Sequence, residues 1–142
     1  MVNISSIFGM IGYPGQAEYC AAKFAVRGFS ETLATEMEPH GVSVTSVHPG
    51  GVATNIARLA QVDVMPDNGK TREEMDAEFD TAAITTAEDA AAIILTGVVK
   101  RKRRVMVGKD AKMVQLIARL FPENYFKILN YTINLGCLYR CK

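Results

Sequence analysis

The sequence predicts an α/β fold in which a small, open parallel sheet is flanked by helices. Short runs rich in β-branched residues alternate with longer segments of helical patterning, which is typical of parallel strands joined by crossover helices. The expected strands lie at 2–6, 42–47 and 105–108. At 142 residues and 49% hydrophobic, the chain is suited to one domain or part of one, and its composition is not that of a disordered protein.

The first expected strand leads into a loop that combines glycines with apolar side chains. Residues 7–16 form this loop, and its apolar side chains are Phe8, Met10, Ile11 and Tyr13. Such side chains either line a pocket beside a site or pack underneath the loop. The sequence leaves both interpretations open.

A long helix is predicted over residues 17–38, ending at Pro39 and Gly41. An apolar stripe at helical spacing is expected to face the core, and it consists of Ala22, Val26, Phe29 and Leu33. Another side of this helix carries small residues, namely Ala21, Ala25 and Gly28. Because small side chains permit close approach, a second helix is able to pack on this side.

The strand at 42–47 ends in a turn with the sequence His48-Pro49-Gly50-Gly51. In open parallel sheets, ligands bind outside the carboxyl ends of the strands. Ser6 and Pro49 both fall at such ends, which predicts that they share one site.

The middle of the chain is expected to contain a polar helix and then an apolar one. Thr71 and Glu74 fit a capping box at the start of the first. Thr86 begins the second, which runs to about Lys100. The basic run 100–104 that follows is interpreted as complementing the dipole of this helix, with a nuclear signal or anion patch as the alternative.

The C-terminal third is expected to end in two helical segments. The first covers 110–121 and stops at Pro122. The second, 123–138, is rich in aromatic and aliphatic side chains. It is expected to cover the mouth of a site, to pack on a partner subunit or to rest on a membrane surface, and the sequence does not choose among these.

Tyr19 and Lys23 form the strongest candidate for chemistry. They lie four residues apart in the predicted helix, so their side chains project from one face, one turn apart. A free phenol is a poor base at neutral pH, and a fixed positive charge beside it favours the phenolate. The hydroxyl of Ser6, thirteen residues before Tyr19, is expected to hold a carbonyl or alcohol oxygen. These groups suit proton transfer at an oxygen atom.

Three segments, in this order and at this spacing, resemble the short-chain dehydrogenase/reductase family. They are Ser5-Ser6 at a strand end, the Tyr19-x-x-x-Lys23 helix and the Pro49-Gly50-x-Val52-x-Thr54 turn. The resemblance is residue by residue over 2–56 and continues as a matching order of helices and strands. It implies a Rossmann-type, doubly wound parallel sheet and hydride transfer between NAD or NADP and a carbonyl or alcohol carbon.

The resemblance also implies roles for single residues. Tyr19 would be the general acid/base, and Lys23 would favour its phenolate and hydrogen-bond the nicotinamide ribose. Ser6 would bind the substrate oxygen, and it is preferred over Ser5 because it has the family's separation from Tyr19.

For the cofactor, the resemblance places the second turn beside the nicotinamide. Pro49, Gly50 and Val52 would lie along the ring, and Thr54 would reach the amide or the phosphate side. The helix 17–38 would pair across a subunit interface, which implies a homo-oligomer. The substrate would be a small carbonyl or alcohol compound, and the apolar loop favours a hydrophobic one.

The family's glycine-rich turn for the cofactor pyrophosphate is not found in the sequence. We therefore expect a single partial Rossmann-like domain over 1–142, the C-terminal part of such an enzyme, with the N-terminal dinucleotide-binding half absent. Its sections are the catalytic strand, helix and turn at 1–56, a substrate lid or acidic surface insertion at 57–85, and a helix-strand-helix unit at 86–142. Its sheet would expose an unpaired strand edge. The alternative function is a catalytically inactive half that serves as an oligomerisation or interaction module.

Composition narrows the partners and the compartment. The formal net charge of +1 predicts no nucleic-acid partner, although the basic C-terminal region leaves contact with an anionic membrane surface as a minor alternative. Cys20, Cys137 and Cys141 are expected to be reduced thiols of a cytoplasmic protein, and no metal site is expected because metal-ligand spacing is absent. No run of 18 apolar residues predicts a spanning helix.

Overall fold

A computed structural model describes residues 1–60 and 71–134 of the chain. Its three strands are β1 (Val2–Ile4), β2 (Thr45–Pro49) and β3 (Arg104–Val107). They form a sheet of order β1-β2-β3 in which both pairs are parallel. Ile4 is in register with Val47, and Val47 with Val105, so all three carboxyl ends lie at one edge of the sheet. The predicted open parallel α/β sheet is confirmed.

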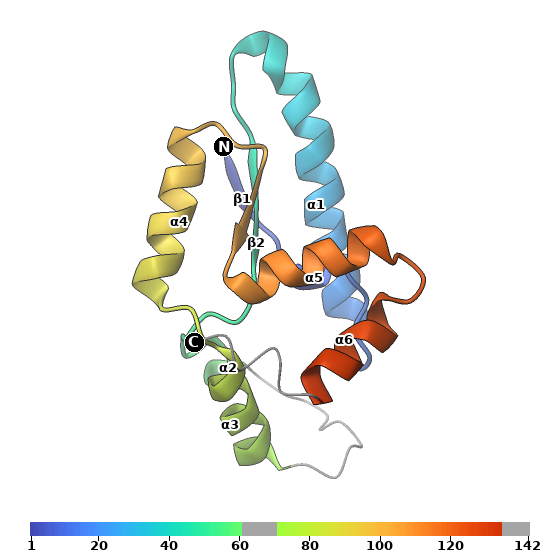
Figure 1. The fold of residues 1–142 in the computed structure, drawn as a ribbon. Helices are drawn as coiled ribbons and strands as arrows, with labels where there is room; N and C mark the ends of the chain where they lie inside the picture. Colours follow the sequence, from blue (N-terminus) through green and yellow to red (C-terminus); the bar gives the residue numbers. More distant parts are fainter. Residues whose placement is uncertain (61–70, 135–142) are drawn as a thin grey trace.

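Helices surround this sheet on both faces. They are η1 (Ile7–Gly9), α1 (Ala17–Met37), η2 (Glu38–His40), α2 (Ile56–Leu59), α3 (Arg72–Ala82), α4 (Ala87–Val99), α5 (Lys109–Leu120) and α6 (Tyr125–Asn134). Figure 1 shows α1 and α4 on opposite sides of the strands, with α5 crossing near their carboxyl ends. The same view places α2 and α3 beyond those ends, and α6 beside the first turns of α1. No helix in the described ranges has the length and apolarity needed to cross a bilayer.

The second strand begins and ends later than the sequence predicted, at Thr45–Pro49 instead of 42–47. Gly41 takes a left-handed conformation with φ of 71°, and the Val42 N–H donates to the Met37 carbonyl oxygen at 3.2 Å. Val42 therefore still completes the end of the preceding helix. The ladder starts only at Thr45, whose N–H donates to the carbonyl oxygen of Met1 at 2.9 Å.

The predicted core-facing stripe of α1 is confirmed only in part, because Val26 and Leu33 are half-buried whereas its other two members are exposed. Phe29 is 61% exposed and Ala22 is exposed, whereas the buried residues of α1 are Cys20, Ser30 and Ala34. A polar contact accompanies the burial of Ser30: the side-chain amide of Asn3 in β1 donates to its hydroxyl oxygen at 3.0 Å. Small side chains on this face bring the helix close to the strand, and the bulky Phe29 consequently points away from it.

On the other face of the sheet, α4 packs over a fully apolar cluster. Its buried members are Val47, Ala90, Val105 and Val107. Gly97 is also buried, and a Cβ atom at this position would overlap the Cγ2 atom of Val105. The absence of a side chain at Gly97 thus sets how closely α4 approaches β3.

We expect Gly97→Ala to lower the free energy of unfolding by about 1–3 kcal/mol, because the new methyl group overpacks the contact with Val105. Denaturant unfolding measures this loss. Val105→Ala removes the obstacle, so the double variant should be more stable than the sum of the two single losses predicts. Thr96→Ala, at the exposed neighbouring position of α4, is the control and should change the free energy of unfolding little. Strict additivity of the two changes would contradict the close contact.

A second apolar cluster lies between the loop after β1 and the C-terminal helices. Ile11, Val114 and Leu129 are its buried members, and Phe8 and Tyr125 pack against it. The Gly12 N–H donates to the hydroxyl oxygen of Tyr125 at 3.1 Å. Of the two interpretations left open for the loop, packing therefore applies to Ile11, whereas Tyr13 remains 42% exposed.

Candidate active site

Tyr19 and Lys23 lie in the first two turns of α1, near the carboxyl ends of the strands. The Lys23 ammonium lies 5.5 Å from the centroid of the Tyr19 ring. The same ammonium donates to the carbonyl oxygen of Ile4 at 3.3 Å, which ties the lysine to the end of β1. Tyr19 is 44% exposed, so its ring is accessible to a ligand.

Ser5 and Ser6 follow β1 directly and have different contacts. The Ser5 hydroxyl donates to the carbonyl oxygen of Lys23 at 2.8 Å, which fixes the strand end to α1. The Ser6 hydroxyl oxygen caps η1 by accepting from the Phe8 N–H at 3.2 Å, which leaves its own proton to donate elsewhere. Ser5 is thus committed to the scaffold, and Ser6 is the serine with a donor to offer. The edge of the Phe8 ring meets Tyr19 at a centroid distance of 6.1 Å.

His48 links the two strand ends and was not among the residues predicted for the site. It is fully buried, and its Nδ1 lies 3.0 Å from the carbonyl oxygen of Ser6. Because a carbonyl only accepts, Nδ1 carries the proton. Nε2 then accepts from the Ser46 hydroxyl at 2.9 Å. Burial lowers the pKa of His48 from its ordinary value, with the charges of Arg104 and Arg27 acting in the same direction and the Ser6 hydrogen bond opposing it.

The turn after β2 is held on two sides. The Gly50 N–H donates to the Val107 carbonyl oxygen at 2.9 Å, and Val52 forms a parallel bridge with Thr85. The side chain of Val52 packs against the apolar cluster under α4, so only its backbone is available to a ligand. Thr54 is exposed. Pro49 and Ser6 lie at the same edge of the sheet, as the register of β1 and β2 requires.

Asp110 is a second residue that sequence reasoning missed. Its Oδ2 atom accepts from the Gly51 N–H at 2.7 Å, although the two residues are 59 positions apart. The two residues meet only in the folded chain, and no local sequence pattern predicts their contact. For His48, the one available signal was its place directly before Pro49.

A series of aromatic contacts leads from Tyr19 through Phe8 to α6. Phe8 stacks on Tyr13 with a centroid separation of 5.1 Å, and Tyr13 meets Phe126 of α6 edge to face at 6.3 Å. The C-terminal helix α6 thus packs on the loop after β1. Whether it covers the mouth of a site, as one of the three interpretations holds, stays a prediction.

The helices α2 and α3 lie at the same end of the sheet (Figure 1). The predicted capping box is present: Thr71 and Glu74 exchange side-chain to backbone hydrogen bonds of 3.3 and 2.8 Å. Arg58 of α2 forms an ion pair with Asp80 of α3. No residue of α3 is buried. Residues 61–70 of the expected lid lie outside the described residues, so the lid interpretation stays a prediction. Cys137 and Cys141 also lie outside the described residues.

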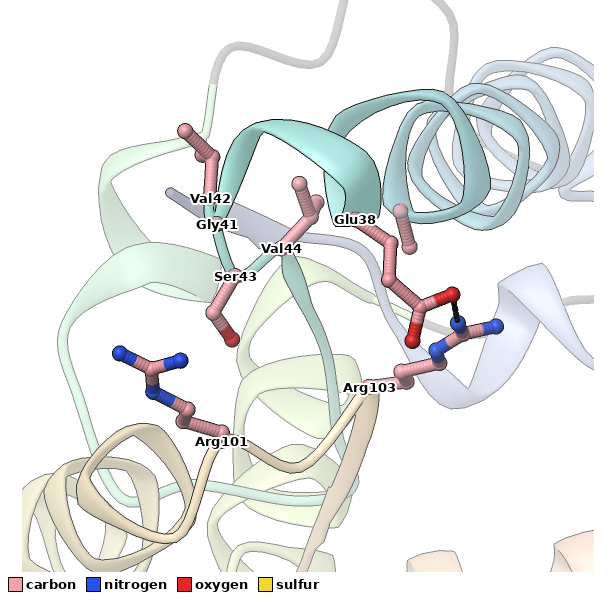
Figure 2. A pocket seen from close by; sticks show the side chains of 8 residues that line it. Glu38, Gly41, Val42, Ser43, Val44, Arg101 and Arg103 are labelled. Atoms are coloured by element: carbon pink, nitrogen blue, oxygen red, sulfur yellow. Dashed lines mark hydrogen bonds and ion pairs between the residues drawn. The ribbon is translucent and has the colours of Figure 1, made fainter.

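A hollow of about 140 Å³ lies at the opposite edge of the sheet, where the strands begin. Figure 2 shows Arg101 and Ser43 on one side of it and the Glu38–Arg103 ion pair, at 2.7 Å, on the other. Arg104 of the same basic run pairs with Glu31 of α1. These ion pairs hold the run against η2 and α1, and its interaction with the dipole of α4 stays a prediction. The hollow is not part of the site around Tyr19.

The residues present fit the nicotinamide end of a dinucleotide. A phenol and an ammonium lie together on α1, while a serine hydroxyl and a glycine turn follow β1 and β2 at the same edge of the sheet. Among the described residues, no group of three or more His, Cys, Asp or Glu side chains is arranged to hold a metal ion.

Comparisons with known proteins point the same way. The family model described as short chain dehydrogenase matches residues 1–64. A Mycobacterium tuberculosis protein named as an oxidoreductase, SadH, is 46% identical over 131 residues, covering 91% of this chain and 46% of its own length. Dehydrogenase/reductase SDR family member 7B of Xenopus laevis is 30% identical over 131 residues, covering 92% of this chain and 39% of its own length.

A solved structure of a short-chain dehydrogenase has a similar fold. The crystal structure of a short-chain dehydrogenase from Streptomyces avermitilis superposes with a TM-score of 0.57 and 26% identity, covering 95% of this chain and 50% of the other. The chain therefore spans about half the length of the relatives it matches. Family motifs, parallel sheet and relatives agree, and the chain belongs to the short-chain dehydrogenase/reductase family.

Proposed function

We propose that this chain carries the catalytic part of an NAD(P)-dependent oxidoreductase that interconverts an alcohol and a carbonyl compound. The observation that carries the proposal is the placement of the Lys23 ammonium 5.5 Å from the Tyr19 ring, beside the end of the strand that bears Ser6. When bound, the nicotinamide cofactor supplies or accepts the hydride. The chain's own residues then handle the proton and hold the reacting oxygen.

In this proposal Tyr19 is the general acid/base. In the reducing direction, negative charge develops on the substrate oxygen, and the Tyr19 phenol donates a proton to it. The Ser6 hydroxyl donates a hydrogen bond to the same oxygen, a contact that gains strength as charge develops. Lys23 places its ammonium beside the ring of this phenol and hydrogen-bonds the ribose of the cofactor.

The turn after β2 is the proposed nicotinamide contact. Pro49, Gly50 and Val52 lie along the ring, and Thr54 reaches the amide or the phosphate side. The remainder of the dinucleotide would be bound by protein outside residues 1–142, because the relatives are about twice as long as the part that matches.

The substrate is proposed to be hydrophobic. The support is the series of aromatic rings that begins with Phe8 against Tyr19 and continues through Tyr13 to Phe126. A lipid-like alcohol, a steroid-like ketone or a long-chain aldehyde has enough apolar area to gain from burial there, at about 25 cal/mol per Å².

The test is hydride transfer in a chimera. The part of the Mycobacterium tuberculosis relative that lies outside its match to this chain is joined ahead of residue 1, and reduced nicotinamide is followed by absorbance. Turnover with hydrophobic alcohols or carbonyls, and less with short polar ones, is the expected result. A folded chimera that binds the cofactor yet turns over no alcohol or carbonyl compound would contradict the proposal.

We also propose that α1 mediates homo-oligomerisation. Its side of small residues, Ala21, Ala25 and Gly28, is exposed, and a Cβ at Gly28 would have nothing within 4 Å. The neighbouring Phe29 is 61% exposed and adds apolar area to the same helix. The same surface would also serve the alternative function, in which the chain is catalytically inactive and acts as an oligomerisation or interaction module.

Ala25→Glu should convert the oligomer to monomer, because it places a carboxylate where two helices would meet. Light scattering coupled to size exclusion measures the mass of wild type and variant. Ala91→Glu, an equivalent change on the exposed side of α4, is the control and should leave the mass unchanged. A wild-type chain that is already monomeric at high concentration would remove the proposal.

A further inference from the structure

Asp110 connects α5 to the turn after β2. It lies in the first turn of α5, directly after β3, and its Oδ2 atom accepts from the Gly51 N–H at 2.7 Å. The neighbouring Gly50 N–H donates to the carbonyl oxygen of Val107 at 2.9 Å. Two successive N–H groups of one turn are therefore bound by the β3–α5 connection, which fixes the orientation of the peptide planes between them.

The carboxylate of Asp110 is enclosed by glycines. A Cβ atom at Gly50 or at Gly108 would overlap this carboxylate, and Gly108 has φ of +99°. A Cβ atom at Gly51 would instead overlap the carbonyl oxygen of Ala82. Each of these three positions accepts only glycine without a shift of its neighbours, so the turn has little freedom to move away from Asp110.

The second carboxylate oxygen makes this arrangement costly. Oδ1 of Asp110 is buried and has no hydrogen-bond partner among the described residues. A buried, half-satisfied carboxylate lowers stability compared with an apolar or fully paired side chain. Buried polar atoms without partners are rare in folded proteins and call for an explanation other than stability.

We propose that Asp110 is a positioning residue for the nicotinamide contact, acting through the N–H of Gly51. By holding this N–H inward, it fixes which backbone groups of Pro49, Gly50 and Val52 face the site. The inference rests on the proposed function, because it takes the turn to be the nicotinamide contact. It assigns to Asp110 no contact with the substrate.

An acidic residue in the first turn of a helix also has an ordinary role, which is to interact favourably with the helix dipole. Asp89 offers the matched comparison, since it is exposed and lies in the first turn of α4. Only its backbone N–H takes part in the cap, by donating to the Thr86 hydroxyl oxygen at 3.1 Å. Asp89→Ala therefore removes a dipole partner and leaves the turn untouched.

The first arm of the test reads the turn itself. In ¹⁵N-labelled chain, the Gly51 amide should resonate downfield and exchange slowly with D₂O. Asp110→Ala should abolish both signatures, whereas Asp110→Asn, which keeps an oxygen acceptor, should retain them. A Gly51 amide that is unchanged in Asp110→Ala would overturn the inference, whatever the chain binds.

The second arm measures affinity for reduced nicotinamide mononucleotide, the part of the cofactor that the turn would contact. Asp110→Ala should weaken binding about tenfold or more, as expected for loss of a hydrogen bond to a charged group. Asp110→Asn and Asp89→Ala should stay within about threefold of wild type. Equal affinity of wild type and Asp110→Ala, with the Gly51 signatures lost, would overturn the positioning role but not the proposed function. A third outcome is that the Gly51 signatures are lost in Asp110→Ala but no folded form, wild type included, binds the mononucleotide. Asp110 would then be purely structural, and the proposed function would be contradicted as well.

Discussion

Tyr19→Phe in the chimera is expected to lower kcat by about two to four orders of magnitude, the usual contribution of a positioned acid/base. The substitution removes only the hydroxyl. The ring keeps its edge contact with Phe8 and its place beside the Lys23 ammonium, so the fold and the cofactor contact should persist. Because the lost group acts on the transition state, KM should change much less than kcat.

Tyr131→Phe provides the control for this experiment. Tyr131 lies on α6 and is 68% exposed, and it takes no part in the aromatic contacts around Tyr19. Its loss of a hydroxyl should leave kcat unchanged. Retention of most activity by Tyr19→Phe would mean that the proton comes from another group, and it would remove the central role given to this phenol.

The second large effect is expected at His48, whose imidazole is fully buried and bonded at both nitrogens. His48→Leu leaves the Ser6 carbonyl and the Ser46 hydroxyl without these partners. Each unsatisfied buried group costs about 1–3 kcal/mol, so unfolding free energy should fall by at least this amount. His48→Asn keeps a donor where Nδ1 lies and should cost less. Chemical denaturation of the two variants measures the difference.

The lowered pKa of His48 also predicts how stability depends on pH. Below about pH 6.5, the ordinary value for histidine, the unfolded chain binds a proton at this imidazole while the folded chain does not. Stability should therefore fall as pH falls through this range, until the folded form is protonated too. Arg27, Glu31 and Arg104 are the charged groups that face the imidazole across α1 and β3, and the two arginines oppose its protonation.

Comparison of wild type with His48→Asn isolates this contribution. Unfolding free energies measured between about pH 7.5 and about pH 5 should converge as the pH falls, since only the wild type has the extra proton uptake on unfolding. A constant difference over this range would show that His48 titrates alike in the folded and unfolded chains, contrary to its buried, singly protonated state.

The sequence was sufficient for those features that depend on local patterns. Thr71 and Thr86 each cap a helix as predicted, because capping needs only a hydroxyl at the right position before a helical run. The four-residue spacing of Tyr19 and Lys23 fixes their proximity within any helix. The parallel strand order follows from strands separated by long helical segments.

Features that depend on contacts between distant segments could not be predicted in this way. The buried face of α1 includes Ser30, which accepts a hydrogen bond from Asn3. The periodicity of apolar residues therefore placed Val26 and Leu33 correctly but misplaced Phe29. Asp110 reaches the turn only because β3 lies beside β2. The start of β2 depends on where β1 offers partners, which composition around Val42 does not reveal.

The proposed cofactor site is tested most directly by a fluorescence titration of the chimera with NADH and with NADPH, beside the same chimera carrying Tyr19→Phe and Lys23→Ala. We expect saturable binding by the wild type that is strongly weakened in the double variant, because the nicotinamide ribose loses its contact with Lys23. Equal binding by both proteins, or no binding by a wild-type chimera that is folded, would contradict a cofactor site at the ends of these strands.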